Sequence, residues 1–195
     1  DDLSSQRYCS LFNLPQNGRY RFIEADVLTA DLAAVFSGAD CVVHLAAITD
    51  AAGSFDKGVQ VERVNYGGTE RVANFCLESR CPMIFFSTTS VYGSQGEVVD
   101  ENCPISDLKP QSPYADSKLK AEILLESLGK TKGLRFITCR FGTIFGVSVG
   151  MRFHTAVNKF CWQAVMGRPI TVWRTALNQH RPYLDLSDAM ESISF

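Results

Sequence analysis

Two side chains that could exchange a proton with a small molecule lie four residues apart, Tyr114 and Lys118. In a helix this spacing places both on one face. A tyrosine alone titrates near pH ~10, but a lysine cation held beside the phenol favours the phenolate and lowers its pKa. The pair could therefore act as a general acid and base on the hydroxyl of a sugar or another alcohol. The same spacing also occurs by chance on many exposed helices, so the elements around the pair decide its meaning.

A cluster of hydroxyl side chains precedes this pair. Met83 to Phe86 is an apolar run that predicts a buried parallel strand, and the hydroxyls of Ser87 to Ser90 come directly after it. Ligands of open α/β sheets bind beyond the carboxyl ends of the strands, so these hydroxyls would lie near a substrate. The alternative is a Ser/Thr-rich turn that caps the next segment.

Strand and helix patterns alternate along the chain. The predicted strands are Tyr20 to Glu24, Cys41 to Leu45, Met83 to Phe86 and Leu134 to Cys139, and the predicted helices are Leu32 to Phe36, Val61 to Ser79, Tyr114 to Leu128 and Ala156 to Val165. This alternation predicts an α/β fold, with a mainly parallel, doubly wound sheet covered by helices on both faces. Ser94 to Pro113 is a polar loop and a candidate lid over the substrate.

The composition supports a single-core protein and gives no support to membrane or nucleic-acid binding. The 195 residues are 46% hydrophobic, enough for one core, and the net charge of −2 gives no support to binding of nucleic acid or a membrane surface. No apolar stretch approaches the ~18–20 residues of a membrane span. The seven cysteines have mostly apolar neighbours, which favours buried free thiols in a cytoplasmic protein. Cys76 and Cys81 have no second pair or histidine nearby, so we expect no metal site.

The motifs, taken in order, resemble the extended short-chain dehydrogenase/reductase family, and in particular its NAD-dependent nucleotide-sugar epimerases and dehydratases such as UDP-glucose 4-epimerase. The resemblance covers nearly the whole chain and rests on Asp1 to Ser4, Asp26-Val27, His44 to Ala47, Asn65 to Thr69, Ser87 to Gly93, Tyr114 to Lys118, Arg140 to Gly146 and Arg181 to Tyr183. It implies a Rossmann-type fold with NAD as cofactor. Residues 1–147 would be part of the NAD-binding domain, and residues 148–195 would begin the smaller substrate-binding portion.

The Gly-rich turn that receives the cofactor's pyrophosphate in this family has no counterpart in the sequence. The chain starts without Met at Asp1, which resembles the end of the family's second strand, and it stops within a helical pattern at Phe195. We therefore expect a fragment that lacks the first strand, the glycine loop and much of the substrate domain. The full-length enzyme is expected to be a homodimer.

The resemblance also implies the catalytic roles. Thr88 would hydrogen-bond the reacting sugar oxygen, Tyr114 would exchange the proton of that oxygen, and Lys118 would bind the nicotinamide ribose and lower the pKa of the tyrosine. A cap at the strand end is the alternative role for Thr88. His44 is interpreted as a packed strand histidine rather than a base.

Further contacts with NAD are implied at four places. Asp1 would bind the adenosine ribose hydroxyls and repel a 2′-phosphate, which favours NAD over NADP. Alternatively, Asp1 is an exposed terminal residue with no such role. Asp26 could likewise serve as the N-terminal cap of the helix near Leu32 instead of a cofactor contact. The remaining implied contacts are Asp26 and Val27 at the adenine, the small-residue stretch Leu45, Ala46 and Ala47 beside the ribose and phosphates, and Asn65, which would hold the neighbouring loops.

On the substrate side, the resemblance implies that Thr88, Thr89, Asn158 and Arg181 contact the nucleotide sugar, with Arg152 a looser candidate. Arg181 would pair with the diphosphate, since a planar guanidinium suits phosphate oxygens. A surface arginine without this role is the alternative.

The two residues that follow Thr88 indicate which type of reaction the enzyme would catalyse. Family members that dehydrate or decarboxylate sugars carry acids where this chain has Thr89 and Ser90, and neither side chain can take a proton from carbon. This favours simple epimerisation through a transient keto intermediate. Thr143 stands where many sugar-nucleotide enzymes have Asn, so the resemblance does not identify the substrate. The alternatives are an NAD-dependent dehydrogenase or reductase of another alcohol, including a hydroxysteroid, and a non-catalytic dinucleotide sensor.

Overall fold

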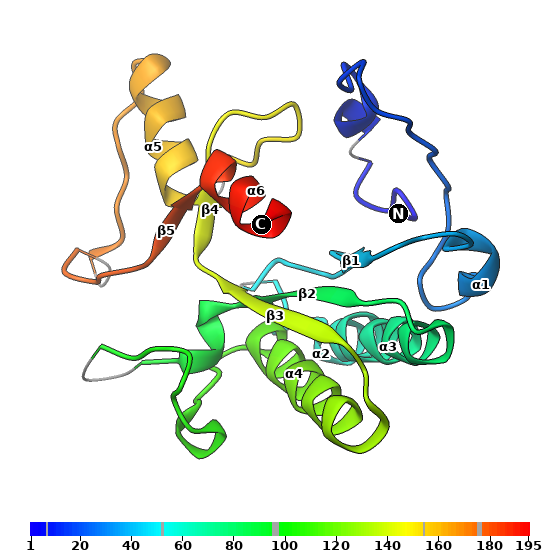
Figure 1. Ribbon diagram of the computed structural model, residues 1–195. Coiled ribbons are helices and arrows are strands. Elements are labelled where there is room, and N and C mark those ends of the chain that lie inside the picture. Colours follow the sequence, from blue (N-terminus) through cyan, green and yellow to red (C-terminus); the bar gives the residue numbers. More distant parts are fainter. Residues whose placement is uncertain (7, 52, 95–97, 154, 175–176) are drawn as a thin grey trace. The chain divides into compact units, whose positions relative to one another are not determined.

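The computed structural model describes residues 1–6, 8–51, 53–94, 98–153, 155–174 and 177–195 (Figure 1). The chain forms two compact units. The first unit comprises Asp1–Asp2 and Arg21–Arg140, and the second comprises Leu3–Tyr20 and Phe141–Phe195. The functional division expected at residues 147 and 148 stays a prediction.

A three-stranded sheet forms the centre of the first unit, with β1 (Val42–His44), β2 (Met83–Thr88) and β3 (Phe136–Phe141) in that order; Phe141 itself belongs to the second unit. Strands β1 and β2 are parallel, and Val42 lies opposite Met83. Helices connect successive strands, as parallel neighbours require. The predicted α/β class with a parallel sheet is confirmed.

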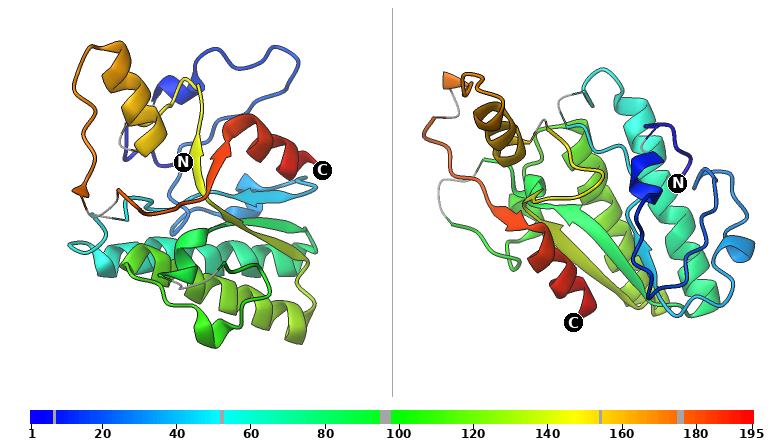
Figure 2. Two further views of the ribbon diagram at one scale, coloured as in Figure 1. Left: turned by 90° about the vertical axis from the view of Figure 1, so that its left-hand side faces the viewer. Right: turned by 90° about the horizontal axis from the view of Figure 1, so that it is seen from above.

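The connections of the first unit are mostly helical. They are α1 (Leu32–Val35), the continuous run of α2 (Gly58–Glu62), a π-helical turn (Arg63–Gly67) and α3 (Gly68–Ser79), the 3₁₀ turns Thr89–Tyr92 and Ile105–Asp107, and the long helix α4 (Pro113–Lys132). Helices α3 and α4 pack side by side against one face of the sheet, as Figures 1 and 2 show. The end of the hydroxyl cluster and the start of α4 thus belong to the same connection, the one between β2 and β3.

The core of the first unit lies between the sheet and these two helices. Its buried members are Leu32, Val42, Val72, Ala73, Cys76, Cys81, Met83, Phe85, Ala121, Leu125, Leu128 and Leu134. Phe85 and Leu125 are fully buried, and burial of each such side chain contributes roughly 1.5–3 kcal/mol. This packing fixes α4 against β2, the two elements that carry the catalytic candidates.

The second unit contains the parallel pair β4 (Thr143–Phe145) and β5 (Tyr183–Asp185). Its helices are α5 (Ala156–Val165) and α6 (Leu186–Ser194), together with the 3₁₀ turn Tyr8–Leu11. Asp185 caps α6, because its carboxylate accepts a 2.8 Å hydrogen bond from the amide of Ser187.

The structure confirms the predicted helix at 156–165 and lengthens the predicted strand at Met83 by two residues. The strand predicted at Tyr20 to Glu24 is wrong, and residues 1–5, which resemble the end of the family's second strand, form no strand in this structure. Among the described residues, no ladder forms along Tyr20 to Glu24, and the nearby backbone bond joins the Ala25 amide to the Asp1 carbonyl at 3.0 Å. An extended segment becomes a strand only when a neighbour supplies such bonds in series.

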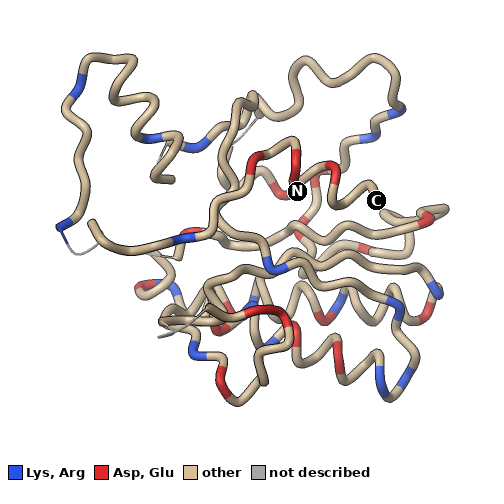
Figure 3. Tube along the Cα trace, turned by 60° about the vertical axis from the view of Figure 1, so that its left-hand side comes forward, with Lys and Arg blue, Asp and Glu red and all other residues tan. Residues whose placement is uncertain are grey.

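All seven cysteines are free, as expected, but only Cys76 and Cys81 are buried, while Cys41 and Cys161 are exposed. Acidic and basic residues are interspersed along the trace (Figure 3), in keeping with the net charge of −2. Within the described residues, no helix combines the length and the apolar character needed to cross a membrane.

Candidate active site

Helix α4 begins at a point fixed by two side-chain hydroxyls. Ser112 caps the helix by accepting a 3.2 Å hydrogen bond from the amide of Ala115, and Pro113 occupies the first turn, where its missing N–H costs nothing. Ser54, fully buried in the loop after β1, accepts a 3.3 Å bond from the amide of Tyr114. The backbone of Tyr114 is therefore held from its own helix and from a loop 60 residues away.

Lys118 lies one turn further along α4 and is almost completely buried, with 3% of its surface exposed. Its Nζ donates a 2.7 Å hydrogen bond to the carbonyl of Phe86 and lies 4.7 Å from the centre of the Phe85 ring. Burial lowers the pKa of Lys118 from 10.5 to about 8, and the negative charge of Glu122 opposes that shift. A lysine ammonium is thus fixed at the carboxyl end of β2.

Thr88 is the last residue of β2 and is buried. Its Oγ1 accepts a 3.1 Å hydrogen bond from the amide of Ser90. The strand-end cap considered from the sequence is therefore present. A hydroxyl that accepts one bond can still donate another, so this cap leaves Thr88 able to donate to a substrate oxygen.

Asn65 holds the loop after β1 to helix α4. It lies in the π-helical turn, is 1% exposed, and exchanges two hydrogen bonds with the backbone of Ile48, at 2.8 and 3.1 Å. Its Nδ2 also donates to Ser117 Oγ at 3.0 Å, and that hydroxyl donates to the carbonyl of Tyr114 at 2.8 Å. The geometry agrees with the loop-holding role implied for Asn65, and π-helical turns often mark functional positions.

His44 is packed in the strand as expected. Its Nε2 lies 3.1 Å from Thr69 Oγ1, and because that hydroxyl donates to the carbonyl of Asn65 at 2.6 Å, Nε2–H is the donor to Thr69. Burial, with a smaller contribution from the charge of Lys118, lowers the pKa of His44 to about 4. The imidazole is therefore neutral near pH 7 and adds no charge beside Lys118.

The residues implied to contact NAD lie in the first unit. Asp26 accepts a 2.9 Å bond from the amide of Leu28, and Val27 packs against the core. The helix cap that was the alternative for Asp26 is formed instead by Asp31, whose carboxylate accepts bonds from Ala33 and Ala34 at 3.1 and 3.2 Å.

The loop after β1 contains two small side chains, Ala46 and Ala47, which would let a cofactor approach the backbone closely. Leu45 and Ala46 are exposed and Ala47 is half-buried, directly before the Ile48 backbone that Asn65 holds. Asp1 is exposed and its carbonyl accepts from Ala25, which precedes Asp26. Two carboxylates and an accessible small-residue loop fit the adenosine and phosphate parts of a dinucleotide.

The implied substrate residues divide between the units. Thr88 and half-buried Thr89 belong to the first unit. In the second unit, Asn158 accepts from the amide of Gly146 at 3.3 Å and donates to the carbonyl of Arg152 at 3.0 Å, whereas exposed Arg181 contacts the side chain of Gln179 at 3.4 Å. The described side-chain contacts of Asn158 and Arg181 are thus within their own unit.

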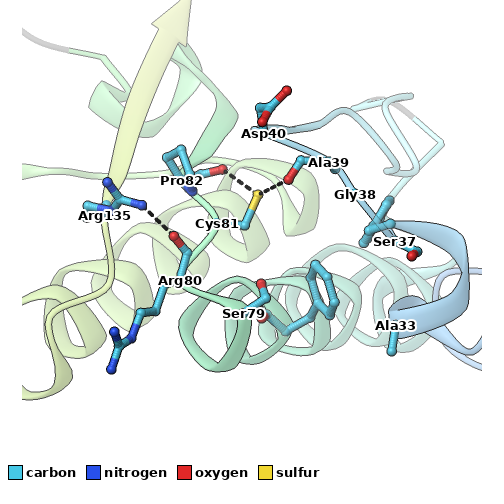
Figure 4. A pocket seen from close by; sticks show the side chains of 12 residues that line it. Ala33, Ser37, Gly38, Ala39, Asp40, Ser79, Arg80, Cys81, Pro82 and Arg135 are labelled. Atoms are coloured by element: carbon cyan, nitrogen blue, oxygen red, sulfur yellow. Dashed lines mark hydrogen bonds between the residues drawn. The ribbon is translucent and has the colours of Figure 1, made fainter.

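A cleft of about 430 Å³ lies at the amino ends of β1, β2 and β3, opposite to the end that carries Thr88 (Figure 4). The thiol of Cys81 donates weakly to the carbonyls of Ala39 and Pro82, at 3.4 and 3.6 Å, and the guanidinium of Arg135 donates to the carbonyl of Arg80. Burial raises the pKa of the Cys81 thiol, which disfavours the reactive thiolate. The thiol of Cys81 and the guanidinium of Arg135 are thus engaged by backbone carbonyls of the protein.

Sequence reasoning missed Ser54, Ser117 and Glu122. Glu122 had a usable signal, because a carboxylate four residues after Lys118 must share its helix face. Ser54 and Ser117 had none, since a serine in a loop or a helix gives no sign of the distant group it will contact.

Comparison with known proteins identifies the family of this chain. The chain matches the family described as "NAD dependent epimerase/dehydratase family" over residues 3–195. It is 32% identical over 189 residues to the uncharacterized UDP-glucose epimerase YtcB of Bacillus subtilis (strain 168), covering 95% of this chain and 57% of that protein.

A second relative is the Arabidopsis thaliana trifunctional UDP-glucose 4,6-dehydratase/UDP-4-keto-6-deoxy-D-glucose 3,5-epimerase/UDP-4-keto-L-rhamnose-reductase RHM3, 30% identical over 196 residues, with 95% of this chain and 29% of that protein covered. The solved structure of UDP-glucuronic acid 4-epimerase from Bacillus cereus, in complex with UDP-glucuronic acid and NAD, is similar with a TM-score of 0.81 at 28% identity, over 92% of this chain and 56% of that one. The chain thus spans little more than half the length of the two Bacillus proteins. These similarities confirm the resemblance and the Rossmann-type fold.

Proposed function

Since the chain belongs to the NAD dependent epimerase/dehydratase family, we propose that it carries the catalytic group of an enzyme that epimerises a nucleotide sugar. One observation carries this proposal: Thr88 ends β2, Tyr114 lies in the first turn of α4, and Lys118 joins the two elements through its 2.7 Å bond to Phe86. A phenol, a fixed ammonium and a hydroxyl donor thereby share one end of the sheet. These are the groups needed to move a proton on and off an alcohol oxygen.

In this proposal, Thr88 donates a hydrogen bond to the reacting sugar oxygen, and Tyr114 removes the proton of that oxygen. The ammonium of Lys118 stabilises the phenolate form of Tyr114, which a tyrosine alone reaches only near pH ~10. NAD, when bound, supplies the hydride acceptor and donor for the sugar carbon. Tyr114 returns the proton when the transient keto sugar is reduced on its other face, so the net reaction inverts one carbon.

The proposed cofactor contacts are Asp1, Asp26, Val27, Leu45, Ala46, Ala47, Asn65, Tyr114 and Lys118, and the proposed substrate contacts are Thr88, Thr89, Asn158 and Arg181. Asp1 would give a preference for NAD over NADP, because its carboxylate repels a 2′-phosphate. The seven free cysteines support a cytoplasmic location. A homodimer is supported by the apolar side chains that the neighbouring helices α2 and α4 expose, Val59 and Ile123.

Product analysis tests this function. The full-length protein, incubated with NAD and UDP-glucose or UDP-glucuronic acid, is expected to form the 4-epimer with no net NADH, as followed by NMR and by absorbance at 340 nm. Thr89 and Ser90 argue against dehydration, because neither can take a proton from carbon. A 4-keto-6-deoxy product would identify a dehydratase, accumulation of NADH a dehydrogenase, and NAD binding without turnover of any nucleotide sugar a sensor.

A further inference from the structure

A buried ion pair that the proposed chemistry does not use lies beneath the candidate site. Glu122, 5% exposed, and Arg140, 16% exposed, meet at 2.7 Å between Oε2 and Nη2. The Nε of Arg140 adds contacts to both carboxylate oxygens, at 3.2 and 3.1 Å. A buried ion pair is weak evidence of a stabilising role, since apolar residues of similar volume often stabilise a core as well or better.

The Glu122–Arg140 pair forms hydrogen bonds with both ends of the segment Ser87 to Tyr92, which contains Thr88. The hydroxyl of Ser87 donates to Glu122 Oε1, and the Nη1 of Arg140 donates to the phenol oxygen of Tyr92 at 3.1 Å. The Arg140 guanidinium also lies 5.0 Å from the centre of the Tyr92 ring. Ser87 to Tyr92 is therefore held at its first and last residues by one pair of charges.

The same carboxylate also faces Lys118. The two residues are one turn apart on α4, and they hold consecutive residues of β2: Lys118 bonds the carbonyl of Phe86, and Glu122 bonds the side chain of Ser87. Among the described residues, the ionisable groups next to this pair include His44 from β1, Arg140 from β3 and Tyr92 from the turn after β2. His44 is neutral above about pH 4, so Glu122 is the negative charge that favours the ammonium of Lys118.

We propose that Glu122 and Arg140 are positioning residues for the reaction, which set the place of Thr88 and keep Lys118 protonated. This inference rests on the proposed function of Tyr114 and Lys118. In this proposal, neither Glu122 nor Arg140 contacts the substrate or the cofactor. Their effect passes through the Ser87 to Tyr92 segment and through the charge on Lys118.

The test is the Glu122→Gln variant of the full-length protein. Losing the carboxylate leaves Arg140 as an unpaired cation, and both changes favour loss of the proton from Lys118. The alkaline limb of the pH profile of turnover should therefore move to lower pH by about 1 unit, and turnover at neutral pH should fall. Glu122→Asp, which keeps the charge, should restore the position of the limb.

A second readout does not depend on activity. The pKa of Lys118 is about 8 in the folded protein and 10.5 as its usual value. Between these values the unfolded state binds more protons, so the free energy of unfolding rises with pH in that window. In Glu122→Gln this rise should begin at lower pH, as measured by urea unfolding from pH 6 to 10. A matched control is Glu126→Gln, which removes an exposed carboxylate paired with Lys130 at 3.0 Å on the same helix and should move neither readout.

The outcomes separate this inference from the proposed function. An unmoved alkaline limb and an unmoved unfolding window in Glu122→Gln would overturn the inference, even if Tyr114→Phe is inactive. If Tyr114→Phe remains active, the proposed function itself fails. If Glu122→Gln does not fold, the Glu122→Leu/Arg140→Met double variant removes both charges without leaving one unpaired. Loss of the carboxylate still favours deprotonation of Lys118 there, so a shift in the same direction but smaller than in Glu122→Gln is expected, and its absence would likewise contradict the inference.

Discussion

Tyr114→Phe lowers the turnover of the full-length protein by roughly 10²–10⁴-fold, the usual contribution of a positioned acid or base. The substitution removes one oxygen from a half-buried ring. The helix start stays fixed, because Ser54 and Ser117 bond the backbone of Tyr114 and not its phenol. Steady-state kinetics with the nucleotide sugar measure the loss, and calorimetry should show that NAD still binds.

Tyr20→Phe is the matched control, since Tyr20 is 55% exposed and lies in the second unit. It should leave turnover unchanged. The assignment of Tyr114 would be refuted by a Tyr114→Phe protein that retains turnover within about twofold of the parent, far short of the range for an acid or base. It would also be refuted if both variants lost activity equally.

Arg140→Met destabilises the fold by about 3–5 kcal/mol, because it leaves the carboxylate of Glu122 buried without its cation. This is a large part of the roughly 5–15 kcal/mol that stabilises a typical domain. Urea unfolding of the full-length protein at pH 7 gives the free energy. Lys130→Met is the control, because the Lys130 side chain is 76% exposed in its pair with Glu126. This substitution should lower the free energy of unfolding by less than about 1 kcal/mol.

The double variant Glu122→Leu/Arg140→Met shows whether charge is the cause. With both charges gone, no unpaired group remains, and stability should return to near that of the parent. A double variant as unstable as Arg140→Met would mean that the site needs the shapes of these side chains rather than their charges. An Arg140→Met protein as stable as the parent would show that the pair contributes nothing.

Local patterns were enough to predict the elements that carry the candidate site. Helix α4 has its own start and stop signals, with Ser112 as cap, Pro113 in the first turn and Gly133 in the left-handed conformation after the last residue. The apolar run from Met83 forms a strand that pairs in parallel with β1, in agreement with the predicted parallel strand, and its residues are buried or half-buried. Tyr114 and Lys118 follow from these elements, since their spacing on a helix needs no other part of the chain.

The misplaced strand shows where local patterns fail. Tyr20 to Glu24 has the composition of a strand, but the ladder that makes a strand is supplied by another part of the chain. No part of the sequence near Tyr20 says whether such a neighbour is present. The strands β4 and β5 were missed for the related reason that three residues are too few to show a period.

The network around Tyr114 could not be predicted either. Asn65 reaches Ser117 across 52 residues, and Ser54 reaches the amide of Tyr114 across 60. Both contacts depend on how the loop after β1 returns to α4, which periodicity does not specify. The resemblance gave Asn65 its loop-holding role, but the bond to Ser117 is visible only in the folded chain.

The structure of the full-length protein with NAD and a nucleotide sugar tests the central proposal most directly. We predict that Tyr114 Oη and Thr88 Oγ1 both lie within about 2.6–3.2 Å of one sugar hydroxyl, the reach of a proton transfer or hydrogen bond. Lys118 Nζ should contact the nicotinamide ribose while remaining close to the carbonyl of Phe86. A sugar bound with its hydroxyls away from Tyr114, or a cofactor bound away from Lys118, would contradict the account.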